Sequence, residues 1–388
     1  MKQLVKTIVL KPDMGCNLRC RYCYEFNRNG NSYQSRHYNI EHLEALIERT
    51  ARLFQDSRIL WMMHGGEPLI NGLEYFVRFC DCIRTTNKKY HVSYRIALQT
   101  NATMLNDDWI DALEKNADLL SERIVSISID GPKNINDLAR VTADESSSFN
   151  MVMAAIDRIR KSSIDFTTIT VVGSHNVDCP NEVYSFIRDL NSNFIKFIPC
   201  YNFNSDGTPE KLGITPTQYA TFMCKIFDLW MNDRLTNSEG KWIVIDPIAT
   251  IISNLTDTKV TWCEYRDEKC DNFTSLYPDG ELWLCDTYNH DENMRSIAYI
   301  GNVNTISDDE LKKALLQPNS VCAYKEFYNS TVDSCGHCDI NKYCHGGCIV
   351  LRERMHAESS KMFAEYCKAK HLLIKHIERG VRLALSKS

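Results

Sequence analysis

The chain has 388 residues, too many for one small hydrophobic core, so we expect more than one domain. Hydrophobic residues make up 44% and charged residues 24%, as in ordinary globular proteins. The formal net charge of −5, without a basic tail, argues against nucleic acid as the partner. No run of about 18 apolar residues occurs, and lysines interrupt the N-terminal apolar stretch, so we expect a cytoplasmic protein with no membrane span. Seventeen cysteines in such a chain indicate metal or redox chemistry rather than disulfides.

The first predicted strand, residues 4–10, leads into a loop with three closely spaced cysteines. They are Cys16, Cys20 and Cys23, with three and two residues between them. Three thiolates on one loop can hold three corners of a four-iron cluster and leave the fourth iron open to a small molecule. The alternative is a structural zinc site, which needs four ligands. The next histidine, His37, is 14 residues further on, so the pattern favours the cluster.

This cysteine spacing resembles that of the radical S-adenosylmethionine (SAM) superfamily. In that family the open iron binds the amino and carboxylate groups of SAM, and an electron from the cluster cleaves SAM to a 5′-deoxyadenosyl radical. Tyr22 stands where the family prefers an aromatic residue. The resemblance implies that Tyr22 packs near the adenine of SAM.

A second motif, His64-Gly65-Gly66-Glu67-Pro68, follows the strand predicted over residues 59–63. Glycines let the backbone approach a ligand closely, and Glu67 can accept hydrogen bonds from an ammonium group. The motif is similar to the Gly-Gly-Glu-Pro motif of the same superfamily. The resemblance implies that Gly65, Gly66 and Glu67 bind the amino group of SAM.

Strands and helices continue to alternate as far as residue 199. Further strands are predicted over residues 94–101, 124–132, 166–172 and 194–199, and helices over residues 41–53, 73–84, 107–120, 150–161 and 182–190. Such alternation implies an α/β fold with a parallel sheet, whose ligands gather at the carboxyl ends of the strands. This is similar to the partial (β/α)6 TIM-like barrel of radical SAM enzymes. By that resemblance Gln99, Ser128 and Arg140 contact the ribose or carboxylate of SAM, although each could instead be an ordinary strand-end or surface residue.

Eight later cysteines form a second pattern. They are Cys263, Cys270, Cys285, Cys335, Cys338, Cys344, Cys348 and Cys367. Eight thiolates suffice for two fully ligated four-iron clusters, and two zinc knuckles are the alternative. Seven of them match the SPASM pattern that follows the barrel in many radical SAM enzymes, and Cys263 adds an eighth.

Spacing alone leaves the pairing of these cysteines open. Resemblance to the anaerobic sulfatase-maturating enzymes implies one auxiliary cluster on Cys263, Cys270, Cys285 and Cys348, and another on Cys335, Cys338, Cys344 and Cys367. With the N-terminal cluster, the expected cofactors are three [4Fe-4S] clusters and SAM. The expected domains are a radical SAM partial barrel over residues 1–215, a helical bridge over residues 216–255 and a C-terminal SPASM domain over residues 256–388.

Asp286 directly follows Cys285. In the sulfatase-maturating enzymes an aspartate at this position is the proposed base that deprotonates the substrate, so Asp286 is a candidate catalytic residue. The alternative is an aspartate that caps the following turn.

The resemblance implies an oxidoreductase that abstracts hydrogen from a peptide or protein, with flavodoxin or ferredoxin as electron donor. The reading we expect first is a maturase that cross-links a ribosomally made precursor peptide. The alternative is oxidation of Cys or Ser in a sulfatase to formylglycine.

The sequence supports each reading in part. Asp286 and the 15-residue lead-in to Cys16 favour the sulfatase reading, and the lead-in leaves no room for a separate leader-binding domain. Two departures count against it. His64 replaces the usual Gln, and Ile349-Val350-Leu351-Arg352 follows Cys348 where a basic segment is usual.

Overall fold

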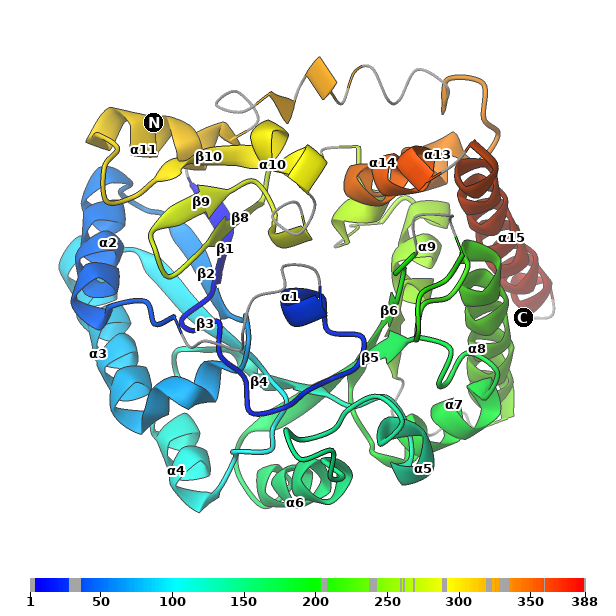
Figure 1. The fold of residues 1–388 in the computed structure, drawn as a ribbon, viewed down its shortest axis with the longest axis horizontal. Helices are drawn as coiled ribbons and strands as arrows, with labels where there is room; N and C mark the ends of the chain where they lie inside the picture. Colours follow the sequence, from blue (N-terminus) through cyan, green and yellow to red (C-terminus); the bar gives the residue numbers. More distant parts are fainter. Residues whose placement is uncertain are drawn as a thin grey trace.

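One open sheet of ten strands forms the centre of the computed structural model, with the helices arranged around it (Figure 1). The structure describes residues 4–27, 36–203, 208–236, 243–258, 260, 262–267, 269–287, 292–318, 323–324, 326–327, 329, 335–358 and 360–386. The strand order is β10-β9-β8-β1-β2-β3-β4-β5-β6-β7. The strands are β1 Val5–Leu10, β2 Arg58–Met63, β3 Ser93–Thr100, β4 Leu120–Ser128, β5 Asp165–Val172, β6 Phe194–Pro199, β7 Val244–Asp246, β8 Phe273–Leu276, β9 Glu281–Trp283 and β10 Tyr299–Asn302.

Helices connect the strands and cover the outer side of the curved sheet (Figure 1). They are α1 Tyr24–Asn27, α2 Ile40–Leu53, α3 Gly72–Tyr90, α4 Asp107–Lys115, α5 Lys133–Asn136, α6 Phe149–Ile159, α7 Pro180–Asp189, α8 Pro216–Thr236, α9 Ile248–Leu255, α10 Glu292–Ala298, α11 Asp308–Leu316, α13 Asn341–Cys344, α14 Ile349–Glu358 and α15 Ser360–Leu385. Among the described residues, short 3₁₀ helices lie at Pro68–Asn71 and Cys263–Tyr265. None of the described helices is long and apolar enough to cross a membrane.

The six strands predicted up to residue 199 are all present and pair in parallel from β1 to β6, which confirms the predicted partial barrel. Several boundaries differ. The helix predicted over residues 73–84 continues to Tyr90 in α3, and the strand predicted over residues 124–132 ends at Ser128 in β4. The helix predicted over residues 107–120 ends at Lys115, because Asn116 closes it by donating its backbone N–H to Ala112 O. Strand β4 consequently begins at Leu120, four residues earlier than predicted.

The sheet extends beyond the six predicted strands on both sides. Strand β7 pairs in parallel with β6, and β8 pairs in parallel with β1 before a hairpin to β9. Strands from the expected bridge and the expected SPASM domain therefore belong to the same sheet as the barrel. Because one sheet runs through all three segments, the domain boundaries at residues 215 and 255 stay predictions.

The long helices α8 and α15 lie side by side (Figure 1). Glu365 accepts a hydrogen bond from Thr217 N at 3.3 Å, and His376 lies 2.7 Å from Asp228. Gly380 allows the close approach, since a Cβ there would lie 2.3 Å from the ring of Phe227. Apolar side chains of α8, among them Phe222 and Phe227, are thus buried in one core cluster with those of α15.

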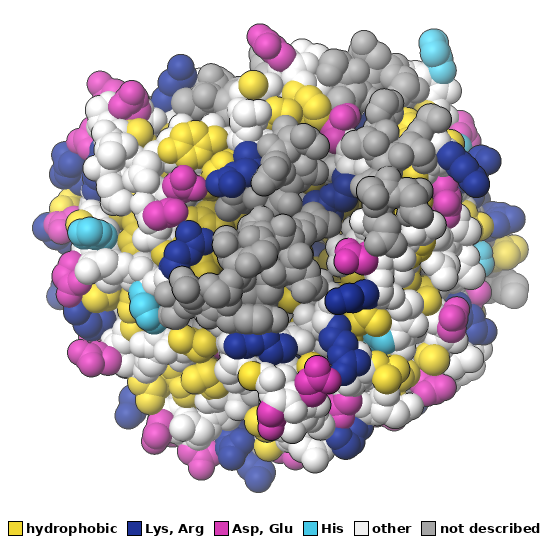
Figure 2. All heavy atoms as spheres, in the orientation of Figure 1, with side chains coloured by type: hydrophobic (Ala, Val, Ile, Leu, Met, Phe, Trp, Pro, Cys, Tyr) yellow, Lys and Arg dark blue, Asp and Glu magenta, His cyan; other side chains and the backbone are white. Residues whose placement is uncertain are grey.

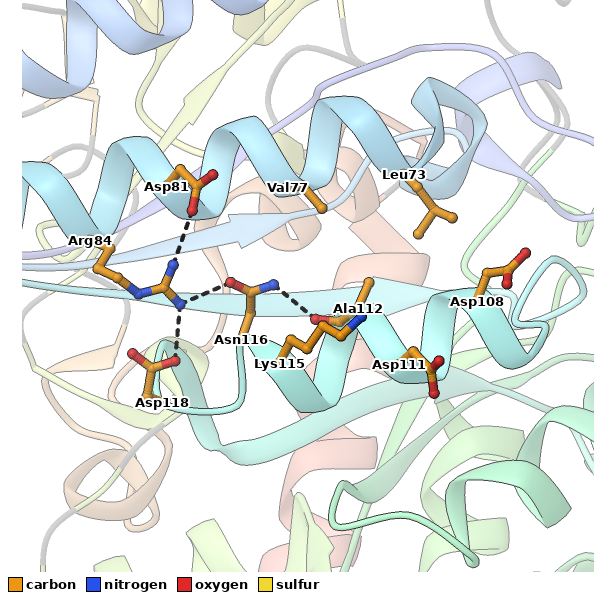
Figure 3. Close-up of a pocket in the computed structure, with 10 residues that line it drawn as sticks. All are labelled: Leu73, Val77, Asp81, Arg84, Asp108, Asp111, Ala112, Lys115, Asn116 and Asp118. Atoms are coloured by element: carbon orange, nitrogen blue, oxygen red, sulfur yellow. Dashed lines mark hydrogen bonds and ion pairs between the residues drawn. The ribbon is translucent and has the colours of Figure 1, made fainter.

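Charged side chains of both signs are interspersed over the described part of the face in Figure 2. A separate surface groove of about 690 Å³ lies between α3 and α4 (Figure 3). There Arg84 donates to Asn116 at 2.9 Å and to Asp81 and Asp118 at 3.1 Å each, which ties the two helices together. None of the candidate site residues lines this groove.

Candidate active site

Two loops at the carboxyl ends of β1 and β2 lie against each other. Glu67 N donates to Gly15 O at 2.8 Å, and Gly66 N donates to Asp13 O at 3.2 Å. A Cβ on Gly66 would lie only 2.0 Å from Gly15 O, so glycine alone permits this approach. The Gly-Gly-Glu motif therefore holds the loop that leads into the first cysteines.

The three N-terminal cysteines are held together on a loop anchored to the segment after β4. Within the cysteine loop, Arg19 N donates a hydrogen bond to Val141 O at 2.7 Å. Burial raises the pKa of Cys16 to about 12, and burial together with the neighbouring thiols of Cys20 and Cys16 raises the pKa of Cys23. Buried thiols are costly to ionise without a cation, whereas a metal centre favours thiolates. This donor set fits the three-cysteine cluster site predicted from the spacing.

The Glu67 side chain is fully buried and holds the ends of β2 and β3 together. One carboxylate oxygen accepts from Leu69 N at 3.1 Å and from Thr100 Oγ1 at 2.7 Å, and the other accepts from Asn101 N at 2.7 Å. Burial raises the pKa of Glu67 despite these donors. The Glu67 carboxylate thus has a structural role, and its contact with the SAM amino group stays a prediction.

A buried polar network lies on the other side of the cysteine loop. Arg140 Nη1 donates to Tyr22 OH at 2.6 Å, and Tyr22 OH donates to Asp130 Oδ2 at 2.7 Å. The ring of Tyr22 stacks on His175 with centroids 5.8 Å apart. Burial opposes the charge on Arg140, but the neighbouring Cys20, Tyr22 and Asp130 outweigh it and raise the pKa of Arg140.

Arg140 Nε has no hydrogen-bond partner among the described residues. A buried guanidinium with an unused donor is suited to a carboxylate ligand, which agrees with the predicted contact to SAM. Gln99 and Ser128 lie half-buried at the ends of β3 and β4, as predicted. The sequence reasoning missed His175, although its position just after β5 was a usable signal.

Asp286 lies in a second network that reaches back to β1. Its Oδ2 accepts from Tyr24 OH at 2.9 Å, and its Oδ1 accepts from Tyr277 OH at 3.1 Å. Lys11 Nζ lies 2.6 Å from Asp286 Oδ1. His64 Nδ1 is 4.0 Å from the other oxygen. These contacts fix both oxygens of the carboxylate, which is itself only partly buried.

Lys11 is fully buried and also pairs with Glu25. Burial opposes its charge, but the carboxylates of Asp286 and Glu25 outweigh burial and hold the pKa of Lys11 well above its ordinary value. Burial raises the pKa of Glu25 in spite of Lys11. The sequence reasoning identified Asp286 but missed Lys11 and Glu25, because their relation to it exists only in the folded chain.

The eight later cysteines fall into two groups. Burial raises the pKa of Cys285, and the neighbouring thiols of Cys270, Cys263 and Cys348 raise it further. Burial likewise raises the pKa of Cys367, with contributions from Cys335 and Cys338. Cys344 is close to the second group, since Cys335 contributes to its raised pKa. As metal ligands, these groups would be the two sets implied by the resemblance, and both that role and the metal content stay predictions.

Comparison with known families agrees with this geometry. Residues 12–187 match the model of the radical SAM superfamily. The chain carries a radical SAM domain. Proteins with this domain are oxidoreductases, and the domain implies a [4Fe-4S] cluster and SAM as cofactors. Cys16, Cys20 and Cys23 lie within the matched residues.

Relatives match over nearly the whole chain. A cysteine-type anaerobic sulfatase-maturating enzyme of Clostridium novyi (strain NT) is 28% identical over 90% of this chain and 88% of its own. A serine-type enzyme of Bacteroides thetaiotaomicron is 24% identical over 93% of this chain and 86% of its own. The solved structure of native anSMEcpe with bound AdoMet superposes with a TM-score of 0.81 at 23% identity, covering 98% of this chain and 100% of that chain. This likeness shows that the two share a fold.

Proposed function

We propose that this protein oxidises a Cys or Ser side chain of a peptide or protein substrate to formylglycine, as an anaerobic sulfatase-maturating enzyme. The observation that carries the proposal is similarity to such enzymes over about nine-tenths of the chain, at 28% and 24% identity. The cross-linking maturase expected first from the sequence has weaker support. The structure of Streptococcus suis SuiB bound to precursor peptide SuiA is 14% identical with a TM-score of 0.56, which is a likeness in fold alone.

The proposal gives the described residues separate tasks. Cys16, Cys20 and Cys23 hold the cluster whose open iron binds SAM, and Arg140 receives the SAM carboxylate through its unused donor. The backbone of Gly65 and Gly66 lies against the loop that leads into the first cysteines, where its carbonyl oxygens would accept hydrogen bonds from the SAM amino group. Bound together, cluster and SAM supply a 5′-deoxyadenosyl radical that abstracts one hydrogen atom from the substrate. An electron donor such as flavodoxin or ferredoxin starts each turnover.

Asp286 is the proposed base in this reaction. A cysteine side chain that loses one hydrogen atom from Cβ, one proton from sulfur and one electron becomes a thioaldehyde, and water converts the thioaldehyde to formylglycine with release of hydrogen sulfide. Asp286 takes the proton. Hydrogen bonds from Tyr24 and Tyr277 hold the Asp286 carboxylate in place. The two later cysteine groups would each hold an auxiliary cluster, for a proposed total of three clusters, and these auxiliary clusters would accept the electron that the substrate loses.

The proposal predicts cysteine as the first substrate to test. The cysteine-type relatives of Clostridium novyi and Clostridium perfringens (strain 13 / Type A) are 28% and 27% identical, against 24% for the serine-type enzyme of Bacteroides thetaiotaomicron. Clusters and free thiols also require a reducing compartment, which supports the cytoplasm as the place of action.

The test uses the protein reconstituted with iron and sulfide without oxygen, then supplied with SAM and dithionite. Three peptides copied from a sulfatase maturation site differ only in Cys, Ser or Ala at the target. Mass spectrometry after hydrazide labelling should find an aldehyde in the Cys peptide, formed with an equal amount of 5′-deoxyadenosine, and none in the Ala peptide. Loss of two hydrogens without an aldehyde would instead support the cross-linking reading. SAM cleavage with every peptide unchanged would refute the proposed substrate class.

A further inference from the structure

A buried arginine contacts the second group of later cysteines. Arg352 lies on α14, four residues after Cys348, and is 3% exposed. Its Nη1 donates to Cys335 Sγ at 2.9 Å and to Gly346 O at 3.0 Å. The guanidinium lies 5.2 Å from the ring centroid of Phe363. These contacts fix a positive charge directly against a sulfur atom.

A histidine also lies beside this group of thiols. A second nitrogen, His371 Nε2, lies 3.5 Å from Cys338 Sγ. His371 also lies 3.3 Å from the Asp339 carboxylate, which offsets a positive charge there. Lys370 also lies near this group, but it pairs with the Glu264 carboxylate and donates to Tyr265 OH at 2.9 Å, whereas Arg352 donates directly to a sulfur atom.

The first group has a different arrangement. Its buried cation is Lys269, whose Nζ donates to Glu264 O at 2.7 Å and to Cys263 O at 3.3 Å. These acceptors are backbone carbonyl oxygens rather than sulfur atoms. The hydrogen bonds described for Lys269 thus go to the backbone, whereas Arg352 donates to a sulfur atom.

We propose that Arg352 raises the reduction potential of the auxiliary cluster held by Cys335, Cys338, Cys344 and Cys367, and acts as its tuning residue. Reduction adds one negative charge to a cluster, and both a fixed cation and an N–H···S hydrogen bond stabilise that charge. Arg352 supplies both through one side chain. This inference rests on the proposed function for the presence of two auxiliary clusters, but adds a role that the overall reaction does not require.

The test measures potentials rather than activity. Cys16, Cys20 and Cys23 are first replaced by Ala so that only auxiliary clusters remain, and the reconstituted protein is titrated with dithionite while EPR follows reduction. Arg352→Gln should lower one of the two midpoint potentials by about 59 mV, a tenfold drop in the reduced-to-oxidised ratio at a fixed potential, and leave the other unchanged. Arg352→Lys keeps the positive charge but loses the planar guanidinium, so it should lower the midpoint potential of the same cluster by less.

Arg382→Gln is the matched control, because it removes the same charge from an exposed position that pairs with Glu378 at 2.8 Å. It should move neither potential. If the Gln variant fails to load iron, the Lys variant decides, and an unshifted Lys variant overturns the inference. If the Arg352→Gln protein holds about eight irons per chain and its two midpoint potentials are both unchanged, or both shifted equally, the inference about Arg352 is wrong and the proposed function is unaffected. Iron near zero in the triple-Ala background overturns the proposed auxiliary clusters as well.

Discussion

The Asp286 carboxylate receives two tyrosine hydroxyls and the ammonium of a fully buried lysine. Lys11 stands between Asp286 and Glu25, so one cation balances two carboxylates. A buried ion pair of this kind is poor evidence for stability, but it fixes the direction of a side chain. At the residue scale, the contribution of Lys11 is therefore to orient the proposed base.

We predict that Asp286→Asn lowers product formation by roughly a hundredfold or more while SAM cleavage continues, because Asn keeps the shape of the side chain but cannot take a proton. Product and 5′-deoxyadenosine are measured in the same reaction by mass spectrometry and chromatography. Tyr24→Phe, which removes one hydrogen bond to Asp286, should give an intermediate loss. Normal product yield from the Asn variant would exclude Asp286 as the base.

Lys6 allows a prediction about pH. Burial outweighs the nearby Asp271 and lowers the pKa of Lys6 from 10.5 to about 8. The unfolded chain therefore binds this proton more tightly, and the folded state gains stability as the pH rises from 8 to 10.5. Below pH 8 the penalty is full, at about 3 kcal/mol before its hydrogen bond to Asp271 O is counted.

Lys6→Met should remove this penalty. The variant should be more stable than the parent at pH 7, and the difference should shrink as the pH approaches 10. Urea unfolding at pH 7, 8, 9 and 10 measures it. Lys115→Met, at an exposed position on α4, serves as the control and should show no such trend. A difference independent of pH for Lys6→Met would contradict the explanation.

At the scale of elements, the site depends on the contact between the loops after β1 and β2. Parallel pairing of β1 with β2 places their carboxyl ends side by side. The Gly66 backbone then packs directly against Gly15 O. The Glu67 carboxylate accepts a hydrogen bond from Asn101 N, which connects the end of β3 to the same loops. These short connections put the cysteine loop where ligands collect in such folds.

Gly66→Ala is predicted to abolish SAM cleavage, because its Cβ would lie 2.0 Å from a backbone oxygen that cannot move without shifting the cysteine loop. Release of 5′-deoxyadenosine measures this. Gly72→Ala is the control, since a Cβ there meets nothing within 4 Å and only a positive φ of 82° opposes it. That variant should lose about 1 kcal/mol of stability and keep its activity. Equal activity of both variants would refute the steric argument.

At the scale of the whole molecule, the sheet brings the later cysteines to the barrel. Strand β8 begins just after Cys270 and pairs with β1, and β9 ends just before Cys285. Through this pairing Asp286 reaches Lys11. The C-terminal part of the chain is therefore built onto the edge of the barrel sheet rather than attached by a linker.

The proposed cofactors predict about twelve irons per chain after reconstitution, as three clusters of four. Replacing Cys16, Cys20 and Cys23 by Ala should reduce this to about eight and abolish SAM cleavage. Iron and sulfide analysis of both proteins measures the numbers. About four irons in the parent would mean that the later cysteines bind something else, and continued SAM cleavage in the triple variant would refute the N-terminal cluster.

Local patterns were enough to predict the alternating strands and helices, the partial barrel, and the two loops that carry Cys16 and Glu67. Apolar periodicity and motif spacing are properties of neighbouring residues, so a linear chain displays them. The same reasoning predicted that Gln99 and Ser128 lie at the ends of their strands. Boundaries such as the end of α4 were less accurate, because a capping asparagine competed with the helical pattern.

Sequence alone determined that this protein carries a radical SAM domain, since the cysteine spacing and the Gly-Gly-Glu motif each lie within a few residues. Tertiary structure decided that β8 joins β1, that Lys11 lies between Glu25 and Asp286, and that Arg352 meets Cys335. Contacts between distant residues depend on strand order and on how helices pack. Periodicity does not encode that order, and the charges that orient Asp286 are therefore visible only in the folded chain.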